Sequence, residues 1–237
     1  MVKPPIKCLI AILCAFVASA GSQTNRASAA PGTANRSPSA QLAGLLAKAH
    51  WRTLQIRFFC YQKSPMLTHG FASGGRIYLA RHRMRYQVDW PVPSVYVLRH
   101  GAVHGKVVGK PWHQIRANQS LHIRPLLTYL DRLGQTKHSH LHIGTVTLLA
   151  NPMPQPPRRD RHFVPPSKSK IIGFGITPMS KRLKHFVTSI ELFVNIRTGL
   201  LSGLKISSHQ GSTEYWFFAV RKNTKCPAKC FRPVGGA

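Results

Sequence analysis

The stretch Val187–Val220 reads VTSIELFVNIRTGLLSGLKISSHQGSTEYWFFAV, and it decides the fold class. Apolar residues occupy every second position from Ile190 to Ile196, which is typical of a strand with one buried face. Two glycine-containing turns divide the stretch into three parts, so it predicts three consecutive antiparallel strands. The predicted strands are Val187–Ile196, with Glu191, Phe193 and Asn195 on the outer face, Leu200–Ser207 and Thr213–Val220.

The rest of the chain repeats this pattern and adds two helical segments. Leucines spaced three and four residues apart predict short helices over Gln41–His50 and Leu121–Leu133. Residues alternate in polarity along Thr53–Gln62, and along Arg76–Trp90 apart from a bend near Ala80–Arg83. Short further strands are predicted at Ser94–Arg99, Gly105–Gly109, Trp112–Ile115, Ser139–Leu149 and Ile171–Ile176, and the six prolines of Asn151–Lys170 indicate a loop or exposed arm.

The charge balance restricts the chemistry open to this protein. The 237 residues include 34 Lys and Arg but only 5 Asp and Glu, which gives a formal net charge of +29. Paired-carboxylate hydrolysis and two-metal phosphoryl transfer each need several acidic side chains at one point. With 43% hydrophobic residues the chain can still build a core, so we expect a folded basic protein that attracts anionic partners.

The N-terminus has the pattern of a cleaved secretory signal. Two lysines precede the apolar segment Cys8–Ala20, which is too short to span a bilayer, and small residues allow cleavage after Ala20 or Ala29. We therefore predict a signal peptide at 1–29, a flexible leader at 30–40 and a single domain at 41–237. Export permits one disulfide among Cys60, Cys226 and Cys230, and short loop closure favours Cys226 with Cys230.

Several motifs together resemble the LolA-like family of periplasmic outer-membrane lipoprotein carriers. They follow the family's order of a signal, a first helix and then the strand motifs. The chain departs from the family with His82 in place of a proline and His100 before Gly101, and its shortened arginine segment is more similar to a divergent LolA-related subgroup. The motifs are Phe58-Phe59-Cys60-Tyr61-Gln62, Gly74–Leu79, Ala80–Tyr86, Pro91–Gly101, and Ile176-Thr177-Pro178 followed by Phe186–Val194.

This resemblance implies an α+β fold in which a strongly curved antiparallel sheet, a half-open β-barrel, carries a helical lid. It implies a carrier, not an enzyme, without a cofactor, that shields acyl chains of a lipoprotein or related lipid between the inner and outer membranes. Its partners would be an inner-membrane release complex and an outer-membrane receptor, with the chain itself a monomer. Arg81 would correspond to the arginine that latches the lid. The candidate cavity residues are Leu54, Ile56, Phe58, Ile77, Leu79, Tyr86, Val88, Ile190, Leu192 and Val194.

The sequence gives weaker support to other functions. The alternative to a carrier is a basic envelope module that binds anionic lipid headgroups or acidic polymers through its surface. His138, His140 and His142 share one strand face, but parallel side chains do not converge on a metal, so we predict no metal site. Export argues against nucleic acid as a partner, and no catalytic elbow or phosphate-binding loop is present in the sequence.

Overall fold

Eleven strands form one antiparallel sheet in the computed structural model. The structure describes residues 37–49, 51–66, 68–80, 83–99, 102–115, 144–151, 153–154, 171–179, 181–185, 187–224 and 228–232. The strand order is β6-β5-β4-β3-β2-β1-β11-β10-β9-β8-β7, so only the pairing of β1 with β11 joins strands far apart in sequence. The strands are β1 (Thr53–Lys63), β2 (Phe71–Ala80), β3 (Arg83–Trp90), β4 (Ser94–Arg99), β5 (Ala102–Val107), β6 (His113–Ile115), β7 (Gly144–Leu148), β8 (Ile171–Pro178), β9 (Ser189–Asn195), β10 (Leu201–Ser208) and β11 (Gly211–Lys222).

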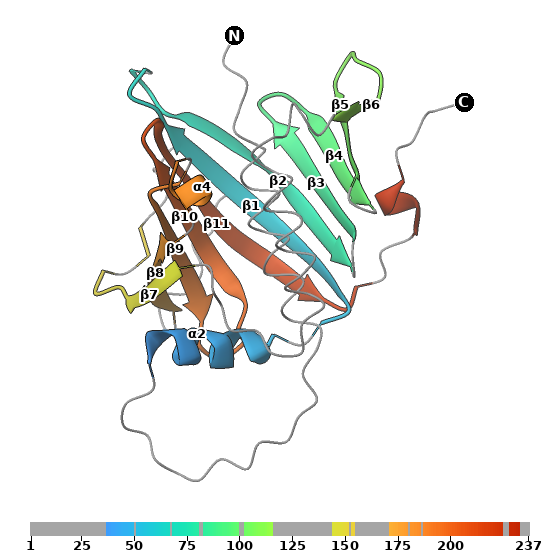
Figure 1. The fold of residues 1–237 in the computed structure, drawn as a ribbon. Coiled ribbons are helices and arrows are strands. Elements are labelled where there is room, and N and C mark those ends of the chain that lie inside the picture. The colour runs from blue at the N-terminus through green and yellow to red at the C-terminus, as the bar shows by residue number, and fades with distance from the viewer. Residues whose placement is uncertain are drawn as a thin grey trace.

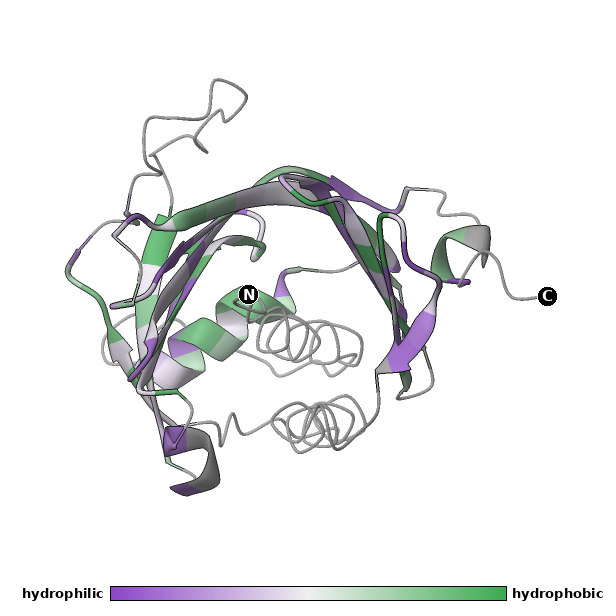
Figure 2. Ribbon diagram, turned by 90° about the horizontal axis from the view of Figure 1, so that it is seen from above, coloured by the Kyte–Doolittle hydropathy of each residue, from purple (hydrophilic) through white to green (hydrophobic). Residues whose placement is uncertain are grey.

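The sheet is strongly curved and partly encloses one helix. Viewed from above, the strands form an arch with α2 (Pro38–Ala47) on its inner side (Figure 2). The helix lies across the lower end of the sheet in Figure 1 and buries Leu42 and Leu45 against it. Its first turn is capped by Ser37, whose hydroxyl oxygen accepts a hydrogen bond from the Ala40 amide at 3.4 Å. The predicted curved sheet is confirmed, and the predicted first helix begins three residues earlier than expected.

The turn between β9 and β10 holds α2 in place. Gly199 in this turn has φ +68°, and a side chain there would collide with the carbonyl oxygen of Leu45. Glycine is therefore required both for the left-handed backbone and for the close approach of the helix. The contact therefore fixes α2 against the lower end of the sheet, on the inner side of the arch.

Two local predictions need correction. Arg76–Trp90 is not one bent strand, because β2 ends at Ala80 and β3 starts at Arg83, and these two residues pair with each other across the sheet. The break in alternation thus marks a chain reversal. Ile196 does not point inward, because β9 ends at Asn195 and the Ile196 side chain is 42% exposed in the following turn.

Near the C-terminus, the 3-10 helix η1 (Ala228–Phe231) packs on the outer face of β3 and β4. Phe231 is buried, and the Arg85 guanidinium donates a hydrogen bond to the Cys230 carbonyl at 3.2 Å.

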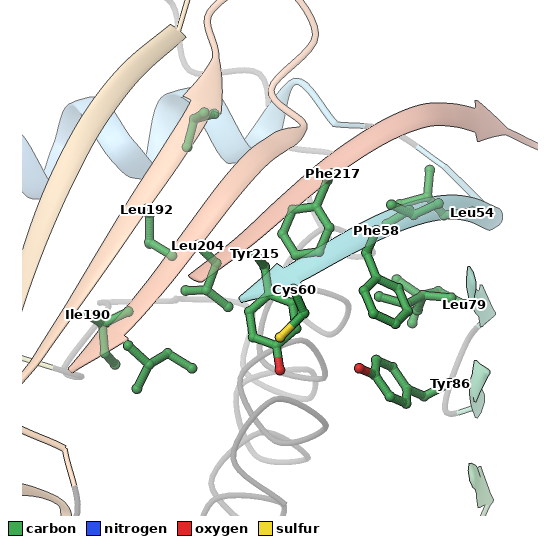
Figure 3. Close-up of a cluster of buried hydrophobic side chains, with 14 of the residues drawn as sticks. Leu54, Phe58, Cys60, Leu79, Tyr86, Ile190, Leu192, Leu204, Tyr215 and Phe217 are labelled. Atoms are coloured by element: carbon green, nitrogen blue, oxygen red, sulfur yellow. The ribbon is translucent and has the colours of Figure 1, made fainter. Parts of the chain in front are cut away.

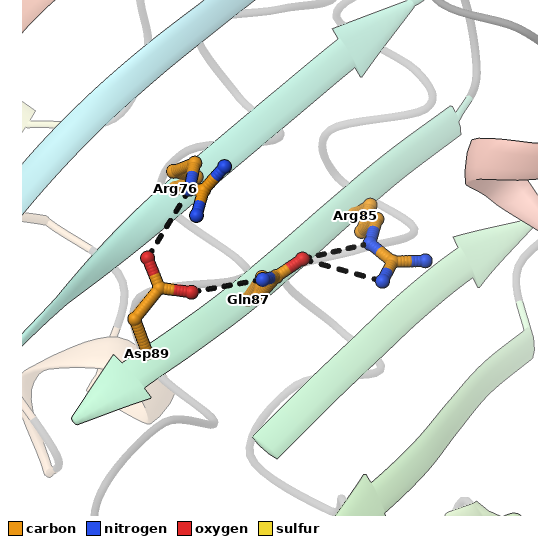
Figure 4. A network of polar contacts seen from close by, with 4 residues as sticks. All are labelled: Arg76, Arg85, Gln87 and Asp89. Atoms are coloured by element: carbon orange, nitrogen blue, oxygen red, sulfur yellow. Dashed lines mark hydrogen bonds and ion pairs between the residues drawn. The ribbon is translucent and has the colours of Figure 1, made fainter. Parts of the chain in front are cut away.

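Arg85 belongs to a row of polar side chains drawn in Figure 4. It also donates two hydrogen bonds to Gln87, which in turn donates to Asp89 at 2.8 Å. Asp89 is paired with Arg76 at 3.2 Å, and this contact raises the pKa of the arginine. The row therefore links the C-terminal helix to the centre of the sheet.

Candidate functional site

The concave face of the sheet carries one continuous cluster of buried apolar side chains. Alternate residues of each strand point to the same face, and the register aligns them in rows across neighbouring strands. One row joins Ile56, Ile77 and Tyr86, while another joins Leu204, Leu192 and Phe174. The cluster also includes the buried leucines of α2, which identifies this face as the inner side of the arch.

All ten candidate cavity residues lie in this cluster, and none is more than 7% exposed. The structure therefore brings together residues from β1, β2, β3 and β9 that are up to 140 positions apart in sequence. Several of them are labelled in Figure 3, with side chains pointing into the same region of the arch. The prediction that they contact a ligand stays a prediction.

Aromatic rings occupy the middle of the cluster. Phe58 stacks on Tyr86 with ring centroids 4.8 Å apart, and the Tyr215 ring lies 6.2 Å away at a tilt. Tyr215 is itself stacked on Phe217 at 6.2 Å. These flat, rigid rings give the centre of the concave face a large apolar area from few side chains. Tyr215 and Phe217 were not among the predicted residues, because Tyr215–Phe218 are four consecutive aromatic residues and give no alternation from which to choose an inner face.

A few polar groups sit among these rings and stay neutral. The Cys60 thiol hydrogen-bonds with Tyr215, Ser73 and Gln62, and burial raises its pKa to about 12. Burial also raises the pKa of Tyr86 well above its ordinary value, against the opposing effect of a hydrogen bond with Tyr215. Both groups are therefore uncharged at neutral pH, which keeps the concave face free of charge at its centre.

Charged side chains of the central strands lie on the convex face. Arg57 and Arg76 face each other across β1 and β2, at positions that alternate with the cluster. Glu191 and Lys205 do the same on β9 and β10, where their charged atoms are 3.0 Å apart. The sheet is thus divided into an apolar inner face and an outer face that carries the charges.

The convex face has a second apolar layer, which the sequence pattern alone does not predict. Phe193 is 2% exposed, and Phe59 packs against Trp216 with ring centroids 5.4 Å apart. The segment after β7 covers this layer, because the Trp216 indole nitrogen donates a hydrogen bond to the Pro154 carbonyl at 2.8 Å. Met153 lies beside Trp216, over Gly203, where an added Cβ would come within 2.5 Å of its methyl carbon. Phe193 is therefore buried by a chain segment that alternation alone does not predict.

Several predicted features fall outside the described residues. These are the signal peptide at 1–29, most of the leader at 30–40, the lid arginine Arg81, the second helix at 121–133 and the histidines at 138, 140 and 142. Cys230 is half-buried in η1, but Cys226 is also outside the described residues, so the predicted disulfide between them stays a prediction.

Within the ranges that the structure describes, no three His, Cys, Asp or Glu side chains come close enough together to hold a metal ion. The helices in those ranges are all too short or too polar to cross a membrane.

Comparison of the whole chain with known proteins finds solved structures of similar fold but no match in sequence. Neither a known family model nor a curated protein matches the amino-acid sequence. The fold is similar to that of LolA-like proteins. A LolA superfamily protein from Nitrosomonas europaea is 9% identical, with 80% of this chain and 96% of that chain covered and a TM-score of 0.38.

Two further solved structures show the same level of similarity. A putative outer membrane lipoprotein-sorting protein domain from Vibrio parahaemolyticus is 12% identical, covers 81% of this chain and 95% of its own, and has a TM-score of 0.40. The lipoprotein LppX of Mycobacterium tuberculosis is 8% identical, covers 78% and 97%, and has a TM-score of 0.44. All three similarities concern the fold alone, at TM-scores below 0.5.

Proposed function

We propose that this protein is a periplasmic carrier that shields the acyl chains of a lipoprotein or related lipid while they pass between the inner and outer membranes. The chains would lie against the concave face, in contact with the residues predicted to line a cavity. The observation that carries the proposal is the division of the sheet into a concave face that is apolar over seven strands and a convex face that holds the charges.

A carrier of this kind needs no covalent chemistry. Each methylene group removed from water contributes about 0.8 kcal/mol, so a chain of sixteen carbons gains on the order of 10 kcal/mol from an apolar surface. The neutral Cys60 and Tyr86 do not oppose this, because burial keeps both groups protonated. The binding is reversible if the elements that cover the chains can move. The predicted moving part is the segment 121–133 or the first helix, with Arg81 as the predicted latch.

The test is mass spectrometry of lipid extracted from the purified protein. We expect co-purified acylated lipid with the wild-type chain and its loss in Leu192→Arg, because the new guanidinium would lie in the concave cluster. Phe193→Arg is the matched control, since its side chain is equally buried but on the convex face. Circular dichroism establishes that both variants fold. Lipid retained by a folded Leu192→Arg variant would contradict the proposal.

A second candidate function is binding of anionic headgroups or acidic polymers by the basic surface. The observation in its favour is that the three carboxylates in the described parts of the chain are all paired, with Lys63, Arg76 and Lys205. Within those parts of the chain, the other exposed cations therefore have no unpaired carboxylate beside them. Salt-sensitive binding of a polyanion by protein that holds no lipid, unchanged by Leu192→Arg, would favour this function over the carrier.

A further inference from the structure

Exposed apolar side chains gather at one end of the sheet. Among the described residues, eight large hydrophobic side chains are exposed, and six of them lie at the end opposite α2. Met66 is 92% exposed, Val108 and Met179 are each 65% exposed, and Val92 is 56% exposed. We call this end the apolar rim, and its residues are Met66, Phe71, Trp90, Val92, Val108 and Met179.

The strand register places these residues together. Phe71 pairs with Gln62 near the end of β1, and Trp90 pairs with Gly74 three positions along β2. Val92 is in the turn that follows Trp90, and the amide of Val108 donates a hydrogen bond to the Pro93 carbonyl at 3.1 Å.

Met179 extends the rim to the far side of the arch. It follows β8, at the end where β9 begins, and it precedes the short helix α4 (Lys181–Lys184). Figure 1 shows the β1–β2 and β3–β4 connections and α4 toward the upper end, with α2 at the lower end.

The apolar rim also carries exposed lysines. Lys106, Lys110, Lys181 and Lys184 are exposed and lie within three residues of Val108 or Met179 in the sequence, or further along α4. The three carboxylates of the described residues are already paired, Asp89 with Arg76 at 3.2 Å, Glu214 with Lys63 at 3.8 Å and Glu191 with Lys205 at 3.0 Å. An end that presents Met, Val, Phe and Trp together with lysines matches the boundary of an anionic bilayer, where apolar groups enter the acyl region and cations meet the headgroups.

We propose that the apolar rim docks on the surface of a membrane rich in anionic lipid. Water-soluble polyanions are a poorer match, because they would contact the lysines and leave the apolar side chains in water. The docked protein would stand with its strands directed at the bilayer and α2 at the far end. This proposal concerns a surface of the molecule and does not depend on whether the concave face binds acyl chains.

The test is co-sedimentation of the purified protein with vesicles of phosphatidylglycerol and phosphatidylcholine in equal parts, compared with phosphatidylcholine alone. We expect binding to the anionic vesicles, weakened by salt. The triple variant Met66→Ser, Val92→Ser, Val108→Ser should bind at least about tenfold more weakly, because it removes three apolar contacts. Each of Lys106→Ala and Lys110→Ala should weaken binding by about fivefold.

The control is the double variant Leu148→Ser, Ile196→Ser, whose side chains are 49% and 42% exposed away from the apolar rim. It should bind vesicles within about twofold of the wild-type chain, since these residues face away from the bilayer. An equal loss of vesicle binding in the triple variant and in the control would overturn the proposal. So would vesicle binding that depends only on the lysines and is matched by soluble polyglutamate. Lipid extracted from the triple variant reports separately on the carrier function.

Discussion

Phe58→Ala and Phe59→Ala should cost similar stability but differ in their effect on acyl binding. The two residues are neighbours on β1 with rings on opposite faces of the sheet, and each is at most 3% exposed. The Phe58 ring stacks on Tyr86 at 4.8 Å, while the Phe59 ring packs against Trp90 at 6.0 Å and Trp216 at 5.4 Å. The pair thus separates packing from ligand contact.

The size of the stability loss follows from burial. Truncating a buried phenylalanine to alanine removes about 3–5 kcal/mol from the free energy of unfolding. A domain of this size loses about 2–4 °C in Tm for each kcal/mol, so both variants should melt about 6–20 °C below the wild-type chain. Urea denaturation followed by circular dichroism measures the free energy, and a temperature scan measures Tm.

Binding of a fluorescent fatty acid then distinguishes the two faces. At a temperature where both variants are folded, Phe58→Ala should change the affinity and Phe59→Ala should leave it at the wild-type value. Two results would refute this reasoning. One is a stability loss below about 1 kcal/mol in Phe58→Ala, which would mean that its ring is not packed. The other is an equal change of affinity in both variants.

Three further predictions concern the packing around the site. The Cys60 thiol has a pKa of about 12 in the folded chain against an ordinary value of 9.0, so its contribution to stability should be constant below pH 9 and be lost as the pH rises from 9 toward 12. Denaturation at increasing alkaline pH measures this loss of stability. Cys60→Ala should flatten the decrease in stability just above pH 9. An unchanged pH profile in this variant would contradict the prediction. Trp216→Phe removes the donor to the Pro154 carbonyl and should lower the free energy of unfolding by about 1–3 kcal/mol, as measured in urea; no loss would show that the segment after β7 is not held there. Arg85→Ala removes the hydrogen bond to the C-terminal helix and should speed chymotrypsin cleavage after Phe231, which is buried in the wild-type chain. An unchanged cleavage rate would mean that other contacts hold the helix.

The sequence predicted the inner face well because alternation reports burial directly. Ile190, Leu192 and Val194 occupy every second position of one strand, and all three lie in the concave cluster. The same rule failed at Ile196, because a strand's end is set by the turn that follows it. Phe193 lies on the outer face as predicted, but it is buried there, because a distant segment covers that face and periodicity within one strand carries no information about such a cover.

The antiparallel order of β9, β10 and β11 followed from their turns, but the pairing of the first strand with the last was beyond reach of local patterns. The pairing of β1 with β11 brings Phe58 beside Phe217, and it creates the aromatic centre of the concave face. Nothing in either strand's own sequence identifies the other as its partner. The apolar rim was missed for a related reason, because its residues are single exposed side chains in separate turns that only the folded sheet brings to one end.

The most direct test of the central claim is photo-crosslinking of a fatty acid that carries a diazirine on its chain, followed by mapping of the modified residues by mass spectrometry. The account predicts adducts on concave-face residues such as Leu54, Ile77 and Leu192. Adducts confined to the convex face, on Phe59 or Trp216, or protein that takes up no label while fully folded, would contradict it.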